Sequence, residues 1–194
     1  MIQLDTIYNI DCLAGMKDIP DQSVDAVICD LPYGTTRNSW DSVIPMDELW
    51  AEYRRVAKET AAIVLFGQQP FTSMLVASNP DMFRYEWIWR KEQATGHLNA
   101  NRAPLKIHEN ILVFYRTQPT YNPQFTEGTP YTARRTSLRS TNYGRQRGTT
   151  TVSDGRRYPV DIIDCERDTD GFHPTQKPVD LLRYLVRTYT DRGG

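Results

Sequence analysis

The sequence predicts an α/β protein with an open sheet and helices on both of its faces. Short apolar runs at residues 24–28 and 61–66 are typical of buried strands, whereas residues 46–59 and 179–190 repeat apolar side chains at helical spacing. Polar residues or glycine follow the strand-like runs, where turns are expected. A chain of 194 residues suits one domain with a sizeable core and an inserted subdomain.

The elements follow in chain order. Residues 1–10 read as a strand interrupted by Asp5, and residues 13–19 as a short helical turn that Pro20 closes. The next strand starts at residue 24 and ends at Asp30. Phe71, Met74 and Leu75 are predicted to face the core from the helix expected at 70–78. The remaining expected elements are a helix at 46–59, a strand at 61–67, a helix at 70–78, strands at 85–91 and 109–115, an extended segment at 158–163 and a helix at 179–190.

The strand that ends at Asp30 runs into an abrupt corner, Asp30-Leu31-Pro32-Tyr33, followed by Gly34. In open α/β sheets, ligands bind beyond the carboxyl ends of strands. A carboxylate and a carbonyl beside a proline accept hydrogen bonds, and tyrosine offers a flat face. This combination suits a planar ring with an exocyclic amine, such as an adenine turned out of a duplex. Four residues alone leave the alternative open that Asp30 caps the next helix and Tyr33 packs in the core.

The composition, with 39% hydrophobic and 24% charged residues, is that of a soluble globular protein. The longest apolar run, residues 61–66, is far shorter than a membrane span, and no signal segment opens the chain. Three unpaired cysteines indicate reduced thiols and a cytoplasmic protein. No metal is expected, since His108 has no carboxylate or thiol at ligand spacing.

Charge is distributed unevenly along the chain. Residues 1–60 carry eleven acids and five basic residues, whereas residues 116–157 carry eight arginines and two acids. Residues 116–159 show no periodicity and read as an irregular insertion: a disordered linker, a surface insertion without function or, as we favour, a recognition insertion for double-stranded DNA. Candidate DNA contacts are Arg37 and Trp40 in the loop after the corner and Arg134, Arg135, Arg139, Arg145 and Arg147 in the insertion.

Asp30-Leu31-Pro32-Tyr33 resembles the (Asp/Asn/Ser)-Pro-Pro-(Tyr/Phe) signature of the amino-methyltransferases of nucleic acids, although Leu31 replaces the commoner proline. The lead-in at residues 8–25 is similar to the segment before the signature in type II DNA adenine methyltransferases. His173-Pro174-Thr175-Gln176-Lys177-Pro178 resembles the family's second hallmark. The resemblance implies a Rossmann-like sheet, S-adenosylmethionine as cofactor and methylation of the N6 amine of a flipped adenine, as in restriction–modification systems and phages.

The resemblance also implies residue roles. Asp30 and a carbonyl near Leu31 or Pro32 orient the amine, and Tyr33 stacks on the base. Asp11, with Cys12 beside it, contacts the cofactor at the end of a strand next to the one ending at Asp30; an Asp11 that only caps the following helix is the alternative. Lys177, and less firmly Thr175, meets the methionine end of the cofactor, where a cation pairs with the carboxylate.

The family's chain normally continues into a strand ending in an Asp-Pro-Phe-x-Gly-Ser-Gly-like turn, and no such turn occurs here. We therefore expect a C-terminally truncated sheet with weak or no activity alone; a homodimer and completion by another chain both stay open. The expected organisation is a catalytic body at 1–115 with the target-base pocket, the insertion at 116–159 and a return segment with a helix at 160–194. The alternatives are a DNA-binding protein without catalysis, a cytosine-N4 methyltransferase, and an enzyme acting on RNA or a protein amide.

Overall fold

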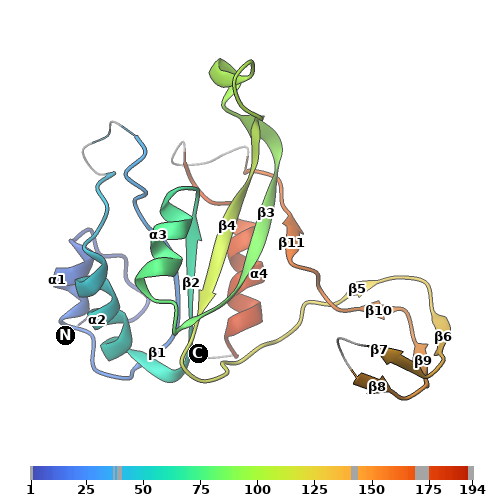
Figure 1. Cartoon of the computed structure of the whole chain (residues 1–194). Coiled ribbons are helices and arrows are strands. Elements are labelled where there is room, and N and C mark those ends of the chain that lie inside the picture. Colours follow the sequence, from blue (N-terminus) through green and yellow to red (C-terminus); the bar gives the residue numbers. More distant parts are fainter. Residues whose placement is uncertain (1, 37, 39–40, 141–143, 169–174, 192–194) are drawn as a thin grey trace. The chain divides into compact units, whose positions relative to one another are not determined.

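The computed structural model describes residues 2–36, 38, 41–140, 144–168 and 175–191. The chain divides into two compact units (Figure 1). The first, which we call the body, comprises Met1–Asn122 and Asp161–Gly194, and the second, the insertion unit, comprises Pro123–Val160. Each unit is described by itself.

The body is built on a mixed five-stranded sheet with the strand order β1-β2-β4-β3-β11. β1 runs parallel to β2 and β11 parallel to β3, whereas β4 is antiparallel to both of its neighbours. The carboxyl ends of β1, β2, β3 and β11 therefore point the same way. The strands are β1 (Val24–Asp30), β2 (Ala57–Gly67), β3 (Phe83–Thr95), β4 (Lys106–Phe114) and β11 (Ile162–Asp164).

Helices cover both faces of this sheet, which confirms the predicted α/β class (Figure 1). Alternate residues of β2 enter different cores: Ile63 and Leu65 pack with helices α1 to α3, whereas Val64 and Phe66 pack with α4. Burial on both faces explains why the run is continuously apolar. The helices are α1 (Cys12–Met16), α2 (Met46–Val56), α3 (Phe71–Ser78) and α4 (Val179–Tyr189). None of the helices in the described ranges is both long and apolar enough to cross a bilayer.

The strand expected at residues 1–10 is wrong. Residues 2–10 form no strand, and a turn interrupts them at Asp5, whose φ of 54° lies in the left-handed region. Leu4 and Ile7 are almost fully exposed, at 89% and 98%. Without a sheet neighbour these apolar side chains gain nothing from an extended backbone. In the described part of the chain β1 therefore pairs only with β2.

Three further boundaries and faces differ from the prediction. Helix α2 ends at Val56 rather than at residue 59, because Ala57 already pairs with Val24 in the sheet. Met74 on α3 is 50% exposed instead of facing the core. Strands β3 and β4 are longer than expected, since they continue beyond the core as a hairpin that extends above the rest of the body in Figure 1.

The insertion unit is not irregular, as its composition had suggested, but consists of three antiparallel strand pairs. The first pair lies next to the unit's two ends, where Thr126 pairs with Arg157, and the Gly128 amide donates to the Gly155 carbonyl at 2.7 Å. The Arg156 guanidinium lies 4.1 Å from the centre of the Phe125 ring. The pairs are β5 (Thr126–Glu127) with β10 (Arg156–Arg157), β6 (Tyr131–Arg135) with β9 (Thr149–Ser153), and β7 (Leu138–Ser140) with β8 (Gly144–Gln146).

Candidate active site

A cavity of about 200 Å³ lies beyond the carboxyl end of β1, where an open α/β sheet binds its ligands. β1 supplies Asp30, which is followed in the wall by Leu31, Pro32 and Tyr33. The remaining side chains come from the loop after Tyr33, from β3 and β4 of the same sheet, and from the chain between β11 and α4. The full lining is Asp30, Leu31, Pro32, Tyr33, Thr35, Thr36, Asp41, Trp89, Lys91, Glu109, Arg167, Thr175, Gln176 and Lys177.

Two carboxylates and two ammonium groups form one connected chain of charges in this cavity. Lys177 Nζ donates to Asp30 Oδ2 at 2.7 Å and lies 3.3 Å from Glu109 Oε2. Lys91 Nζ donates to the other Glu109 oxygen, Oε1. The side chains of Lys177, Lys91 and Glu109 are 9%, 7% and 11% exposed. Each buried charge is thus paired with an opposite one, as removal from water requires.

Glu109 Oε2 lacks the hydrogen bond that Glu109 Oε1 and Asp30 Oδ2 each accept from a lysine. It is buried without a hydrogen bond of acceptable geometry, although Lys177 Nζ lies 3.3 Å away. Lys177 therefore bonds directly to Asp30 while remaining within ion-pair distance of Glu109. This places one cation between two anions, only one of which lies at the signature corner.

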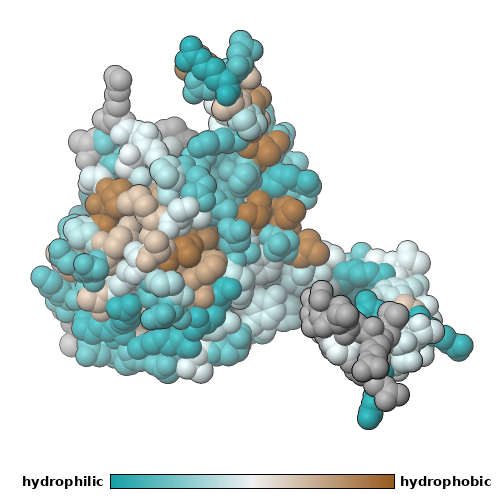
Figure 2. All heavy atoms as spheres, in the orientation of Figure 1, coloured by the Kyte–Doolittle hydropathy of each residue, from teal (hydrophilic) through white to brown (hydrophobic). Residues whose placement is uncertain are grey.

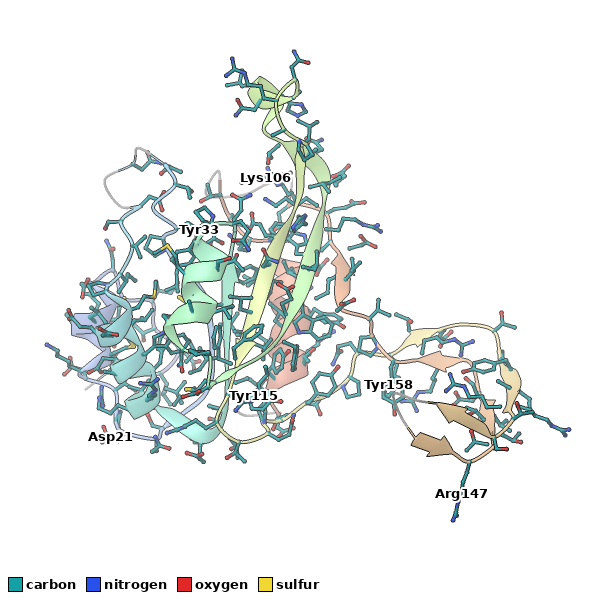
Figure 3. The ribbon with its side chains drawn as sticks, in the orientation of Figure 1. Asp21, Tyr33, Lys106, Tyr115, Arg147 and Tyr158 are labelled. Atoms are coloured by element: carbon teal, nitrogen blue, oxygen red, sulfur yellow. The ribbon has the colours of Figure 1, made fainter. Side chains whose placement is uncertain are left out.

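Tyr33 fixes the other oxygen of Asp30. Its hydroxyl donates to Asp30 Oδ1 at 2.9 Å, and its ring stacks on Phe71 with centroids 5.2 Å apart. Tyr33 is labelled in Figure 3. Burial, and next the negative charge of Asp30, raise the pKa of the Tyr33 phenol well above its ordinary value. The phenol therefore keeps its proton and acts as a hydrogen-bond donor. Both Asp30 oxygens are thereby held in fixed positions.

The loop after Tyr33 is held by the carboxylate of Asp41. Gly34, with φ of +66°, turns the backbone so that the amides of Gly34, Thr35 and Thr36 all donate to Asp41, at 2.9, 2.9 and 2.6 Å. Burial alone would raise the pKa of Asp41, but the hydrogen bonds from Thr36 and from the backbone amides outweigh it and lower the pKa. Asp41 thus fixes one wall of the cavity.

We expect Asp41→Asn to lower the free energy of unfolding at pH 7 by about 2 kcal/mol, since an amide offers one acceptor oxygen and places an N–H against backbone amides. The lowered pKa means that this contribution is complete above pH ~4, the ordinary range of the group, and is lost as the pH falls through the folded-state value. Urea unfolding at pH 7 and at pH 3 measures both effects. The exposed Asp81→Asn is the control, and an equal loss in both variants would contradict the assignment.

The structure brings most of the predicted catalytic and cofactor-binding residues together. Asp30, Leu31, Pro32, Tyr33, Thr175 and Lys177 all line the cavity. Asp11 and Cys12 are not part of that lining; Asp11 caps α1 by accepting a hydrogen bond from the Ala14 amide at 2.9 Å. Asp11 also does not follow a strand, because residues 2–10 form none. Arg37, Trp40 and His173 lie outside the described residues.

Eight lining residues were not among the predicted site residues: Thr35, Thr36, Asp41, Trp89, Lys91, Glu109, Arg167 and Gln176. Lys91 and Glu109 each stand next to strongly apolar strand segments, where a charged residue is unusual. That contrast is the signal that could have found them. It does not say that the two lie side by side, which depends on the register between β3 and β4.

Comparison with known proteins assigns the class. A family model described as DNA methylase, of the N6/N4 methyltransferase type, matches residues 24–194, so this chain belongs to that family. S-adenosylmethionine is the methyl donor of these enzymes. The fold is similar to that of M1.HpyAVI in its complex with S-adenosylmethionine, with a TM-score of 0.57, 18% identity and coverage of 95% of this chain and 76% of that one. The PvuII DNA methyltransferase, which is cytosine-N4-specific, is similar with a TM-score of 0.60, 12% identity and coverage of 95% and 70%.

Proposed function

We propose that this chain methylates the N6 amine of an adenine in double-stranded DNA, with the base turned out of the duplex. The observation that carries the proposal is the Asp30 carboxylate, held by Tyr33 and Lys177 at the end of β1 in a lined cavity. A base inside a duplex cannot enter such a cavity, so the target must leave the stack.

The side chains in the cavity fit the cofactor of the family. The carboxylates of Asp30 and Glu109 suit a positively charged group, whereas Lys177 and Thr175 suit the carboxylate at the methionine end. The orphaned oxygen Glu109 Oε2 offers a buried acceptor to a cationic or N–H group. When bound, S-adenosylmethionine supplies a methyl group on a sulfonium, from which a neutral thioether departs as a good leaving group.

The residues of the corner act by positioning. Asp30 accepts a hydrogen bond from the exocyclic amine and takes up the proton that the amine loses as its new N–C bond forms. Each carboxylate oxygen accepts more than one hydrogen bond, so the amine binds without displacing Tyr33. A backbone carbonyl at Leu31 or Pro32 takes the second N–H, and Pro32 keeps that carbonyl rigid. Most of the rate then comes from alignment.

Adenine is preferred to cytosine as the target because aspartate stands first in the corner sequence. In the related signatures serine is typical of cytosine-N4 enzymes, whereas aspartate favours adenine. The second candidate is an N4-cytosine methyltransferase, and the similarity in fold to the cytosine-N4-specific PvuII enzyme favours it. Both reactions methylate an exocyclic amine, so the same corner serves either.

The insertion unit is assigned to DNA recognition. Two of its arginines stabilise the unit itself: Arg156 lies over the Phe125 ring, and Arg157 donates to Ser153 Oγ at 2.9 Å. Arg134, Arg135 and Arg147, by contrast, are exposed, and Arg147 extends away from its ribbon in Figure 3. The main chains of Arg139 and Arg145 are register partners in β7 and β8. Exposed guanidinium groups suit phosphates and guanine edges.

We expect the double variant Arg134→Ala, Arg135→Ala to weaken DNA binding mostly at low salt, since each lost phosphate contact releases one fewer counterion. The slope of log affinity against log salt should fall by about 2. Titration of labelled duplex over a range of salt concentrations measures it. Arg187→Ala on α4, an exposed arginine of the body, is the control. An unchanged slope in the double variant would remove these arginines from the DNA interface.

The function itself is tested by incubating the chain with unmethylated duplex DNA and S-adenosylmethionine labelled in the methyl group, followed by identification of the modified nucleoside. N6-methyladenine is the expected product, and N4-methylcytosine would transfer the proposal to the second candidate. Salt-dependent DNA binding without incorporation and without cofactor binding would instead favour a DNA-binding protein that lacks catalysis.

A further inference from the structure

The hairpin formed by β3 and β4 continues past the cavity. Trp89, Lys91 and Glu109 line the cavity from these strands, and the pair then runs on to Thr95 and Lys106, which are register partners. At ~3.3 Å per residue, the four residues from Lys91 to Thr95 carry the strand about 13 Å further. Figure 3 shows Lys106 near the base of the hairpin tip, above Tyr33 of the cavity wall. Hairpin and cavity both belong to the body.

The tip suits a polyanion rather than a protein core. Residues 93–108 contain no acid, and residues 96–108 are exposed throughout. Figure 2 shows mainly hydrophilic residues there. The basic and amide side chains are those that bind phosphates and base edges. They are His97, Asn99, Asn101, Arg102, Lys106 and His108.

Of the large apolar side chains of this tip, Leu98 is by far the most exposed, since Leu105 and Ile107 nearer the sheet are only 38% and 41% exposed. Leu98 is fully exposed, with 102% relative accessibility. It lies in the middle of a short 3₁₀ turn, η1 (His97–Asn99), which begins after Gly96 with φ of +92°. The turn is closed by hydrogen bonds from the Asn99 amide to the Gly96 carbonyl at 2.9 Å and from the Arg102 amide to the Asn99 carbonyl at 2.8 Å. A single exposed leucine is ordinary, but this one is held out on a hydrogen-bonded tip that extends past the cavity.

We propose that Leu98 is a wedge that enters the stack of duplex DNA at the position of the extruded base. The inference rests on the proposed function, which requires the target to leave the duplex. Apolar side chains, leucine among them, are inserted between base steps by proteins that distort DNA. The basic and amide residues of the tip would hold the neighbouring phosphates, and the cavity below would receive the base.

The wedge is tested with two duplexes of the same sequence, one intact and one with a single abasic site. An abasic site offers a gap whose unstacking cost is already removed, so the full chain should bind it about tenfold more tightly than the intact duplex. Leu98→Ala should lose this preference, whereas Leu98→Met should keep it. Because Leu98 is fully exposed, its replacement leaves the fold intact. Leu4→Ala, at 89% exposure elsewhere in the body, should change neither affinity.

The salt dependence of binding separates the wedge from a general loss of DNA contacts. Leu98→Ala should keep the wild-type slope of log affinity against log salt, since it removes no charge. A preference for the abasic duplex that persists in Leu98→Ala, or that is absent from the wild-type chain, would overturn the wedge and leave the methyltransferase proposal standing. Absence of DNA binding to either duplex would overturn both.

Discussion

Asp30→Asn is expected to reduce methyl transfer by about 10³-fold while leaving DNA affinity nearly unchanged. The amide has nearly the same shape as the carboxylate, so the bond from Lys177 survives at the remaining oxygen. The amide, however, cannot take up the proton that the target amine loses, and its NH₂ group faces an amine that is itself a donor. Single-turnover incorporation of labelled methyl into duplex DNA measures the loss, and titration of the same duplex measures the affinity.

Asp25 provides a matched control on the same strand. It accepts a hydrogen bond from Lys58 at 2.6 Å, as Asp30 does from Lys177, but it does not line the cavity. Asp25→Asn should therefore leave transfer within about twofold. Transfer that persists in both Asp30→Asn and Asp30→Ala would remove Asp30 from the reaction, whereas equal losses in Asp25→Asn and Asp30→Asn would point to a disturbed strand instead.

Lys177→Met is expected to lower the free energy of unfolding by about 3 kcal/mol. Removing the cation leaves Asp30 and Glu109 facing each other across a partly buried space, and breaking one partner of a buried pair typically costs this much. Adding Asp30→Asn to Lys177→Met should restore about half of the loss, because the anion that bonded directly to Lys177 is then neutral, while Glu109 keeps its ion pair with Lys91. Urea unfolding of the two single variants and the double variant gives the coupling between the sites.

An exposed ion pair, Lys58 with Asp25, is the control for the stability loss expected in Lys177→Met. Lys58 and Asp25 are both 44% exposed, so Lys58→Met should cost less than 1 kcal/mol, as exposed ion pairs do. If Lys177→Met cost no more than Lys58→Met, the charges in the cavity would be far better solvated than their burial indicates. A double variant no more stable than Lys177→Met would mean that Asp30 gains nothing from Lys177.

Local patterns in the sequence were sufficient for the main strands and helices of the body. The continuous apolar run of β2 and the apolar stripes of α2 and α4 reflect burial of those elements. This burial leaves the same local pattern whichever elements pack against them. The corner at Asp30 was predictable for the same reason, since strand, carboxylate and proline are adjacent in sequence. The strand prediction failed at residues 2–10 because an extended segment with exposed apolar side chains becomes a strand only beside a neighbouring strand. The presence of that neighbour is not encoded in the segment itself.

The rest of the site depends on long-range pairing. Lys91 and Glu109 come together only through the register of a hairpin, and Lys177 reaches Asp30 across 147 positions of sequence. No periodicity within a window of residues encodes such a meeting. The insertion unit shows the opposite difficulty: its strands have two to five residues each, too short for alternation to stand out against threonine, arginine and glycine.

The paired strands β5 and β10 have a consequence for how such a protein can change. They join the insertion unit's incoming and outgoing chain within the unit itself, through the Thr126–Arg157 pair and the bond between Gly128 and Gly155. Because its two ends are paired with each other, the insertion unit can be shortened, lengthened or exchanged by recombination at two points. Such a change breaks no strand of the five-stranded sheet. Under the proposed roles, replacement of the insertion unit alone would change the recognised DNA sequence, while the cavity of the body would keep the same methyl-transfer chemistry.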